Sequence, residues 1–273
     1  MLRLSELICC APWGSGDRLG LKKVFVGSYG FASRMILLSV SAASAQTPPA
    51  PLPSETTVTP NPNPFEGENE SFQWSKALRQ SAVFLGFQHT FRIMTEPGSR
   101  AELRGPFFKD YALSVRGYGG WKDGDSQFVN YVGHPMMGAS SGWIFVHNDP
   151  RARRQQFGLT KDYWSSRLRA AAWSTAYSAV FELGPASEAS IGNRGKERWS
   201  AGLVDLVITP TLGTGLLVLE DLLDRHVVLP IERRWPNRVV VAFTRSWLNP
   251  NRSFANMLRL KKPYHRDTRR LGQ

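Results

Sequence analysis

Long apolar segments rich in small residues constrain the fold of this chain most strongly. Their periodicity is helical, and glycine or proline pairs follow most of them. The segments cover residues 71–94, 107–118, 130–146, 163–183 and 199–224. We therefore expect an all-α bundle of five or six apolar helices. Pro210 lies inside the last of these segments and removes one backbone hydrogen bond, so we expect a kinked helix there.

Composition and charge agree with a folded helical core. The chain is 42% hydrophobic and 21% charged, which excludes a disordered protein. Residues 46–224 hold 17 basic and 18 acidic residues, whereas residues 225–273 hold 12 basic and 2 acidic residues. The pattern predicts a nearly neutral core domain over residues 66–235 and a basic C-terminal segment over residues 236–273.

Residues 1–45 carry the pattern of an export signal. The basic pair Lys22 and Lys23 precedes a mostly apolar run, and Ala43 and Ala45 give a small-x-small cleavage pattern. The first 20 residues fit the pattern poorly, which favours a translation start further downstream. An N-terminal helix that anchors the protein in a membrane is the alternative. We expect an exported protein, periplasmic or membrane-associated, in the cell envelope.

A proline-rich stretch follows the predicted cleavage point. Residues 46–65 alternate proline with small polar residues, which is typical of an extended linker. The only two cysteines, Cys9 and Cys10, precede this linker. A cleaved chain would therefore contain neither a disulfide nor a cysteine nucleophile.

Three predicted helices carry polar residues at intervals of about four on faces that are otherwise apolar. These residues are Asn130 and His134; Ser174, Ser178 and Glu182; and Asp205, Thr209, Gly213, Glu220 and Asp224. Residues four apart share a helix face. A buried ionisable group is costly unless it is paired, so we expect the three faces to meet. This arrangement would bring His134, Glu182 and Asp205 together, with Asn130, Ser178 and Thr209 as supporting polar groups.

Two interpretations of this polar cluster stay open. It is either an acid/base or ion-binding site, with His134 as the base and Glu182 or Asp205 as its orienting carboxylate, or a satisfied network that fixes the helix packing. Pro135 favours a helix start at His134, where the helix dipole would disfavour the charged imidazole. A site should open to a pocket, whereas a packing network should be sealed.

The other motifs argue against common enzyme classes. Residues 138–142 match G-x-S-x-G, but a nucleophile elbow needs a strand before the serine and a helix after it. Here the motif lies inside a helical run, so we interpret it as helix packing. There is no H-E-x-x-H, no phosphate-binding loop, no dinucleotide fingerprint and no Cys/His cluster. We therefore expect no cofactor and no bound metal.

The basic C-terminal residues suggest an anionic partner. In an exported protein this would be membrane lipid or other anionic headgroups, not nucleic acid. The residues concerned are Arg252 and, in the predicted lipid contact, Arg259, Lys261, Lys262, Arg266, Arg269 and Arg270. We expect residues 259–273 to be irregular, and a solvated tail without a partner is the alternative.

The order and spacing of several motifs resemble an uncharacterised family of bacterial cell-envelope proteins. The motifs are Asn130-x3-His134-Pro135-x2-Gly138, Glu182, Asp205-Leu206-x2-Thr209-x3-Gly213 and Asn249-Pro250-x-Arg252. The resemblance covers residues 72–258. Phe181 departs from it, because that family has a tryptophan before the glutamate. The chain is more remotely similar to VanZ-like membrane proteins.

These resemblances imply a helical, membrane-linked envelope protein and no particular reaction. His134, Glu182 and Asp205 are the shared polar positions. Our leading expectation is a structural or non-enzymatic protein. The alternative is a hydrolase or transferase that acts on lipid or glycan headgroups through the His-carboxylate site.

Overall fold

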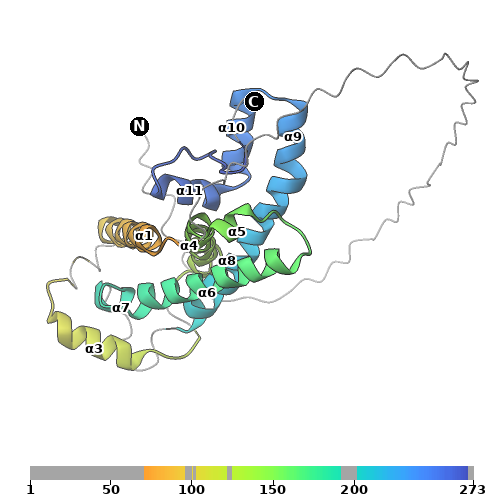
Figure 1. Ribbon diagram of the computed structural model, residues 1–273. Helices are drawn as coiled ribbons and strands as arrows, with labels where there is room; N and C mark the ends of the chain where they lie inside the picture. Colours follow the sequence, from red (N-terminus) through yellow and green to blue (C-terminus); the bar gives the residue numbers. More distant parts are fainter. Residues whose placement is uncertain (1–70, 96–99, 101–102, 122–124, 192–201, 270–273) are drawn as a thin grey trace, which may run out of the picture. The chain divides into compact units, whose positions relative to one another are not determined.

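The computed structural model describes residues 71–95, 100, 103–121, 125–191 and 202–269. Within these residues every regular element is helical and no strand occurs (Figure 1). The prediction of an all-α bundle is therefore confirmed. The predicted export signal and the proline-rich linker lie outside the described residues.

Five longer helices agree with the five predicted segments. They are α1 (Trp74–Thr95), α3 (Phe107–Gly117), α4 (His134–Asn148), α6 (Lys161–Leu183) and α8 (Val204–Leu223). Shorter elements bring the described part of the chain above the predicted five or six helices. They are η2 (Val129–Gly133), α5 (Pro150–Arg154), α7 (Glu188–Ile191), η3 (Asp224–Val228), α9 (Leu229–Arg234), α10 (Arg238–Trp247) and α11 (Pro250–Leu258). Pro210 lies inside α8, and the kink expected there stays a prediction.

Helix α4 lies at the centre of the bundle. It packs on α8 and α6 and also contacts α1 and α11 (Figure 1). Every residue of α4 except Met136 is buried. A helix that is apolar or small on all sides suits such a position, because it has no face that needs water.

The crossing of α4 and α8 depends on two glycines. A Cβ atom on Gly138 would lie 1.9 Å from the backbone oxygen of Thr209, and one on Gly213 would lie 2.7 Å from Cα of Gly138. The two backbones therefore touch at this point. The G-x-S-x-G motif lies within α4, so the structure supports its interpretation as helix packing and not as a nucleophile elbow.

Two π-helical turns each precede an X-Pro pair. Turn η2 ends where His134-Pro135 begins, and η3 ends where Leu229-Pro230 begins. Proline offers no N–H for the ordinary i→i−4 bond, so the helix widens by one residue. The backbone N–H of His134 donates to the Val129 carbonyl across this turn. Helix α4 thus begins at His134, as expected, but the π-helical turn continues the helix before it, so the backbone N–H of His134 is already paired.

Helix α10 shows how capping overrides a local strand preference. Three consecutive valines, residues 239–241, favour a strand by propensity. Asn237 accepts hydrogen bonds through Oδ1 from the backbone N–H groups of Val239 (2.8 Å) and Val240 (3.4 Å). This cap starts a helix over all ten residues of α10.

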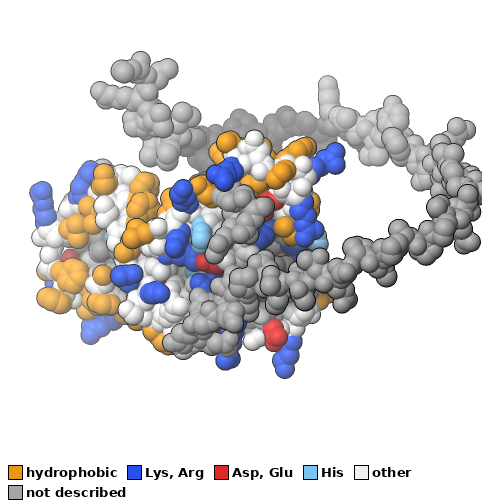
Figure 2. All heavy atoms as spheres, turned by 45° about the horizontal axis from the view of Figure 1, so that its top comes forward, with side chains coloured by type: hydrophobic (Ala, Val, Ile, Leu, Met, Phe, Trp, Pro, Cys, Tyr) orange, Lys and Arg blue, Asp and Glu red, His pale blue; other side chains and the backbone are white. Residues whose placement is uncertain are grey.

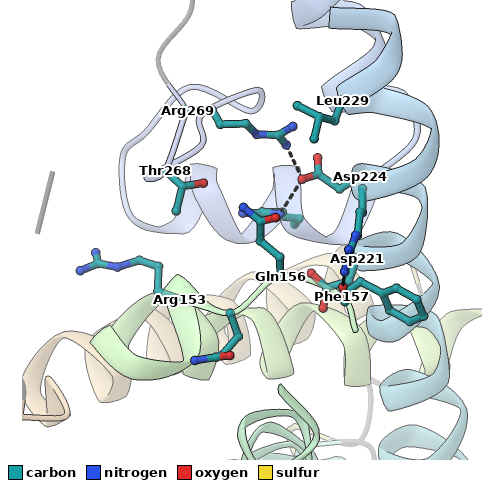
Figure 3. A pocket seen from close by; sticks show the side chains of 11 residues that line it. Arg153, Gln156, Phe157, Asp221, Asp224, Leu229, Thr268 and Arg269 are labelled. Atoms are coloured by element: carbon teal, nitrogen blue, oxygen red, sulfur yellow. Dashed lines mark hydrogen bonds and ion pairs between the residues drawn. The ribbon is translucent and has the colours of Figure 1, made fainter. Parts of the chain in front are cut away.

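Residues 259–269 form turns and contain no helix, so the prediction of an irregular segment is confirmed for them, but ion pairs hold this part of the basic tail to the core. Asp224, in η3, pairs with Arg266 at 3.1 Å and also with Arg269, and Figure 3 shows the second of these pairs. Asp267 pairs with Arg259 at 2.9 Å. The few carboxylates in this region each pair with more than one guanidinium group, and these ion pairs hold the segment against the core.

Large apolar side chains are exposed along the whole length of α1. Trp74 and Leu78 lie on one side of its first turns, and Val83, Phe87, Phe91 and Met94 share another side further along. Figure 2 shows hydrophobic side chains gathered on the left of the view, where α1 and α3 lie. In addition, residues Val204–Arg234 form one helical stretch long and apolar enough to cross a membrane, judged by length and composition alone. Part of this stretch packs against α4 and α6 inside the bundle.

Candidate functional site

Three helix ends bring the predicted polar residues together. His134 is the first residue of α4, Glu182 the last but one of α6, and Asp205 the second of α8. Each offers one ligand-type atom, and these atoms all lie within 4.8 Å of one another. All three side chains are buried. The predicted polar faces of the three helices thus meet at one end of the α4–α8 crossing.

Both ring nitrogens of His134 have a polar neighbour. Nε2 lies 3.3 Å from Oδ1 of Asp205, and Nδ1 lies 3.3 Å from Oγ1 of Thr209. A neutral imidazole donates from one nitrogen and accepts at the other. The threonine hydroxyl can complement either tautomer, whereas an ionised Asp205 only accepts. With a proton on Nε2, the imidazole turns a donor toward the Asp205 carboxylate, and the Thr209 hydroxyl donates to Nδ1.

The supporting residues divide into two groups. Ser178 is fully buried and donates to the backbone oxygen of Asp205 at 3.3 Å. Thr209 is also fully buried and contacts His134 as described. Asn130 lies in η2, one turn before His134, and is buried there but is not part of the cavity wall described next. Ser178 and Thr209 therefore hold Asp205 and His134 in place.

The cluster forms part of the wall of an open cavity of about 310 Å³. This position separates the two interpretations of the sequence, because a sealed packing network would have no such opening. The rest of the wall is mixed. Apolar side chains come from Phe87, Phe91, Val129, Met137 and Phe181, and charged ones from Arg92, Asp125 and Glu188.

The Arg92–Glu188 ion pair is a feature of the wall that the sequence did not reveal. A signal was available on α1, where Gln88, Arg92 and Thr95 follow helical spacing and all line the cavity. Glu188 could not be placed, because α7 is only four residues long and follows a loop. The pair joins α1 to α7 across the cavity.

Phe181 separates two histidines. Its ring stacks on that of His89, with centroids 5.2 Å apart, and meets the ring of His134 edge-on at 6.4 Å. His89 is held by the backbone oxygen of Ala186 at 2.8 Å, and burial lowers its pKa. The aromatic character of the tryptophan in the resembled motif is thus kept by Phe181.

A second set of buried carboxylates lies at the other end of α8. Glu220 accepts from the indole Nε1–H of Trp143 at 2.6 Å and from the backbone N–H groups of Asn251 (2.8 Å) and Arg252 (3.1 Å). It thereby binds the first turn of α11 to α4. Burial raises the pKa of Glu220 to about 7, although these hydrogen bonds oppose the rise.

The neighbouring carboxylates at this end pair with arginines. Asp221 accepts from Nε of Arg167 at 2.7 Å. Burial alone would raise the pKa of Asp224, but the nearby guanidinium groups, including Arg252, hold it below its usual range. The cavity beside Asp221 and Asp224, whose lining Figure 3 shows, is only about 30 Å³. This end therefore forms a packing network.

Searches of protein-family models, curated proteins and solved structures give no match for this chain. The resemblance to the envelope family therefore rests on its motifs alone. The chemistry of the site has to be argued from its own atoms. One imidazole and two carboxylates beside an open cavity can move a proton or hold a cation.

Proposed function

We propose that this chain is an exported, membrane-associated envelope protein whose cavity is an active site for hydrolysis or transfer on lipid headgroups. One observation carries the proposal: a buried His-Glu-Asp cluster lies on the wall of a cavity that borders the exposed apolar face of α1. This favours the enzymatic alternative over a purely structural protein.

The shape of the wall supports an amphiphilic substrate. Phe87 and Phe91 line the cavity and yet remain 56% and 62% exposed, so they lie at its rim. The acyl part of a lipid can contact these rings, while the headgroup reaches the polar cluster. Apolar walls with a few fixed polar groups are typical of small-molecule sites.

The hydrogen bonds suggest how the roles are divided. Both nitrogens of His134 are occupied, by Asp205 and by Thr209, so we assign the imidazole a positioning role. Glu182 then acts as the general base. It accepts a proton from water, the water oxygen attacks an ester or phosphodiester bond of the headgroup, and the proton returns to the leaving oxygen.

Membrane association would use a second surface. The residues Arg238, Arg245, Lys261, Lys262, Tyr264, His265, Arg266 and Arg269, together with Leu260, line a basic cavity of about 590 Å³. On the adjoining helix α10, Val239, Phe243 and Trp247 are exposed and four residues apart. A basic surface beside an apolar stripe suits an anionic lipid layer.

The structure refines which tail residues can serve in this contact. Lys261 and Lys262 are exposed. Arg259, Arg266 and Arg269 are engaged with Asp267, Asp224 and Glu232, so they mainly order the segment. Arg270 lies outside the described residues. We therefore propose the two lysines as the main lipid contacts.

The activity is tested with the purified full chain on vesicles that contain phosphatidylglycerol and phosphatidylethanolamine. Headgroup release is followed by mass spectrometry. We expect Glu182→Gln to reduce the rate at least about 100-fold, since a base contributes on the order of 10² to 10⁴. Asp162→Asn, an exposed carboxylate on α6, is the control. A wild-type chain that releases nothing, with variants that only melt at lower temperature, would support the structural alternative.

The membrane contact is tested by vesicle flotation at low salt. Replacing Lys261 and Lys262 with glutamine should weaken binding to anionic vesicles roughly 10- to 30-fold, at about 1 kcal/mol for each lysine. Lys109→Gln with Lys161→Gln removes the same charge from exposed positions elsewhere and serves as the control. Equal losses from both double variants would contradict a specific lysine contact.

Export is tested by N-terminal sequencing of the protein from its native host. The mature chain should begin at Gln46. A mature chain that still contains Cys9 and Cys10 would contradict the proposed compartment.

A further inference from the structure

We infer that His134, Glu182 and Asp205 bind one divalent first-row metal ion, of the Zn²⁺ or Mn²⁺ type. This inference rests on the proposed function, because it concerns the same cavity. With the ion bound, Glu182 would bind it through one carboxylate oxygen and keep the other to accept the proton of water. The inference departs from the expectation of no metal, which relied on the lack of a known ligand motif in the sequence.

The spacing of the three side chains fits an ion of this size. Zn²⁺ lies about 2.0 to 2.2 Å from nitrogen and oxygen ligands, so two tetrahedral ligand atoms are about 3.4 Å apart. Nε2 of His134 and Oδ1 of Asp205 are 3.3 Å apart. All three ligand atoms lie within 4.8 Å of one another, so only small side-chain shifts are needed for all three to reach the same ion.

Thr209 orients the imidazole for metal binding. A ligating histidine usually donates its second ring N–H to an oxygen, which fixes the ring. Nδ1 of His134 lies 3.3 Å from the buried hydroxyl of Thr209, which can accept this bond. Metal binding would thus move the ring proton from Nε2 to Nδ1 and reverse the Thr209 hydrogen bond.

The charge of the cavity wall favours a cation. Among the described residues, four carboxylates line it, from Asp125, Glu182, Glu188 and Asp205, against one guanidinium, that of Arg92. Arg92 is paired with Glu188. Glu182 lies in the last turn of α6, where the helix dipole disfavours a negative charge and a nearby cation would compensate it.

The ligand set indicates the class of ion and leaves room for substrate. One nitrogen and two oxygens suit Zn²⁺ or Mn²⁺, whereas Ca²⁺ takes six to eight oxygens. With three protein ligands and an open cavity of about 310 Å³ beside them, coordination positions stay available for water or a headgroup oxygen.

The first test is calorimetric titration of the untagged, EDTA-treated full chain with Zn²⁺ and with Mn²⁺. We expect one ion per chain. His134→Gln, Glu182→Gln and Asp205→Asn should each weaken binding at least about 100-fold, and Thr209→Val about 10-fold through the ring orientation. The controls His226→Gln and Asp162→Asn change exposed residues outside the cavity and should leave binding unchanged.

A second measurement needs no substitution and covers the case in which a variant fails to fold. Nitrogen-15 NMR of the wild-type imidazoles should show one ring changing from the Nε2–H to the Nδ1–H tautomer when Zn²⁺ is added. No such change, no stoichiometric binding, or equal losses in His226→Gln and His134→Gln would each overturn the inference.

The two proposals can fail separately. If headgroup release persists in EDTA and no ion binds, the metal inference is overturned and the proposed lipid activity stands. If one ion binds at these residues but no headgroup is released, the metal site is supported and the proposed lipid activity is contradicted.

Discussion

The two ends of α8 bury carboxylates in opposite ways. At the Glu220–Asp224 end, backbone N–H groups and arginines meet the carboxylates, and the adjoining cavity is about 30 Å³. At the Asp205 end, the carboxylate meets a histidine and a second carboxylate beside a cavity of about 310 Å³. Burial alone therefore does not identify a functional acid. Its partners and its access to space distinguish a packing role from a site.

The largest expected effect lies between the two ends, where α4 and α8 touch. Gly138→Ala places a methyl group against the Thr209 backbone oxygen, so we expect a loss of more than about 3 kcal/mol in the free energy of unfolding. Gly215→Ala, on α8, places its methyl group where no atom lies within 4 Å, so it should instead gain up to about 1 kcal/mol. Chemical denaturation measures both. Similar values for the two variants would show that the helices do not touch at Gly138.

The next largest effect concerns the Glu220–Asp224 end of α8, which we call the sealed end. Arg167→Met leaves Asp221 buried without its guanidinium, which should cost about 3 to 5 kcal/mol in the free energy of unfolding. The double variant Arg167→Met with Asp221→Leu should recover a large part of this loss, since no charge then remains buried. Urea denaturation of the three proteins gives the comparison. A single variant as stable as wild type would remove the argument that this end is a packing network.

A smaller, pH-dependent effect also belongs to the sealed end. His147 is buried near Arg259, Arg252 and Arg266, and burial, followed by these cations, lowers its pKa well below 6.5. The unfolded chain then binds the proton more readily, so stability is complete above pH 6.5 and falls as the pH drops below it. The loss should reach up to about 1.4 kcal/mol per pH unit.

The test compares wild type with His147→Phe between pH 7 and pH 5. The variant keeps a ring in the space but has no titrating group, so the fall in stability that His147 causes in this window should be absent. Glu220, whose pKa is about 7, titrates in both proteins, so its contribution cancels when the two curves are subtracted. Asp224 contributes outside this window, because its lowered pKa makes stability fall only below about pH 4. Parallel curves for the two proteins would contradict a neutral, buried His147.

The smallest expected effect on stability lies at the Asp205 end of α8, beside the open cavity. Glu182→Gln keeps the shape of the side chain and removes one of two adjacent negative charges, so its free energy of unfolding should stay within about 1 kcal/mol of wild type, with a gain favoured. Thermal melting measures it beside the activity and metal assays. A loss as large as that of Arg167→Met would place Glu182 among the packing residues instead.

The sequence predicted the features that depend on apolar periodicity and on the positions of helix-breaking glycine and proline residues. The long helices followed from apolar spacing and terminating pairs, and the meeting of His134, Glu182 and Asp205 followed from the cost of burying them apart. It did not predict the cavity, because an opening depends on how side chains such as Phe87 and Phe181 fill the space between helices. It also did not predict that ion pairs hold residues 259–269 to the core, because the pairing of arginines with Asp224 and Asp267 depends on contacts far apart in the chain.

The π-helical turn before His134 changes which side of the helix faces solvent. The added residue rotates everything upstream by about 100° relative to an uninterrupted α-helix. Phe128, just before the turn, is 71% exposed and Tyr131, within it, 47%, while α4 after the turn is almost wholly buried. One continuous helix thus has exposed aromatic residues before His134 and buried residues after it. Deleting a single residue from η2 would keep the helix continuous and rotate the exposed aromatic residues toward the protein interior.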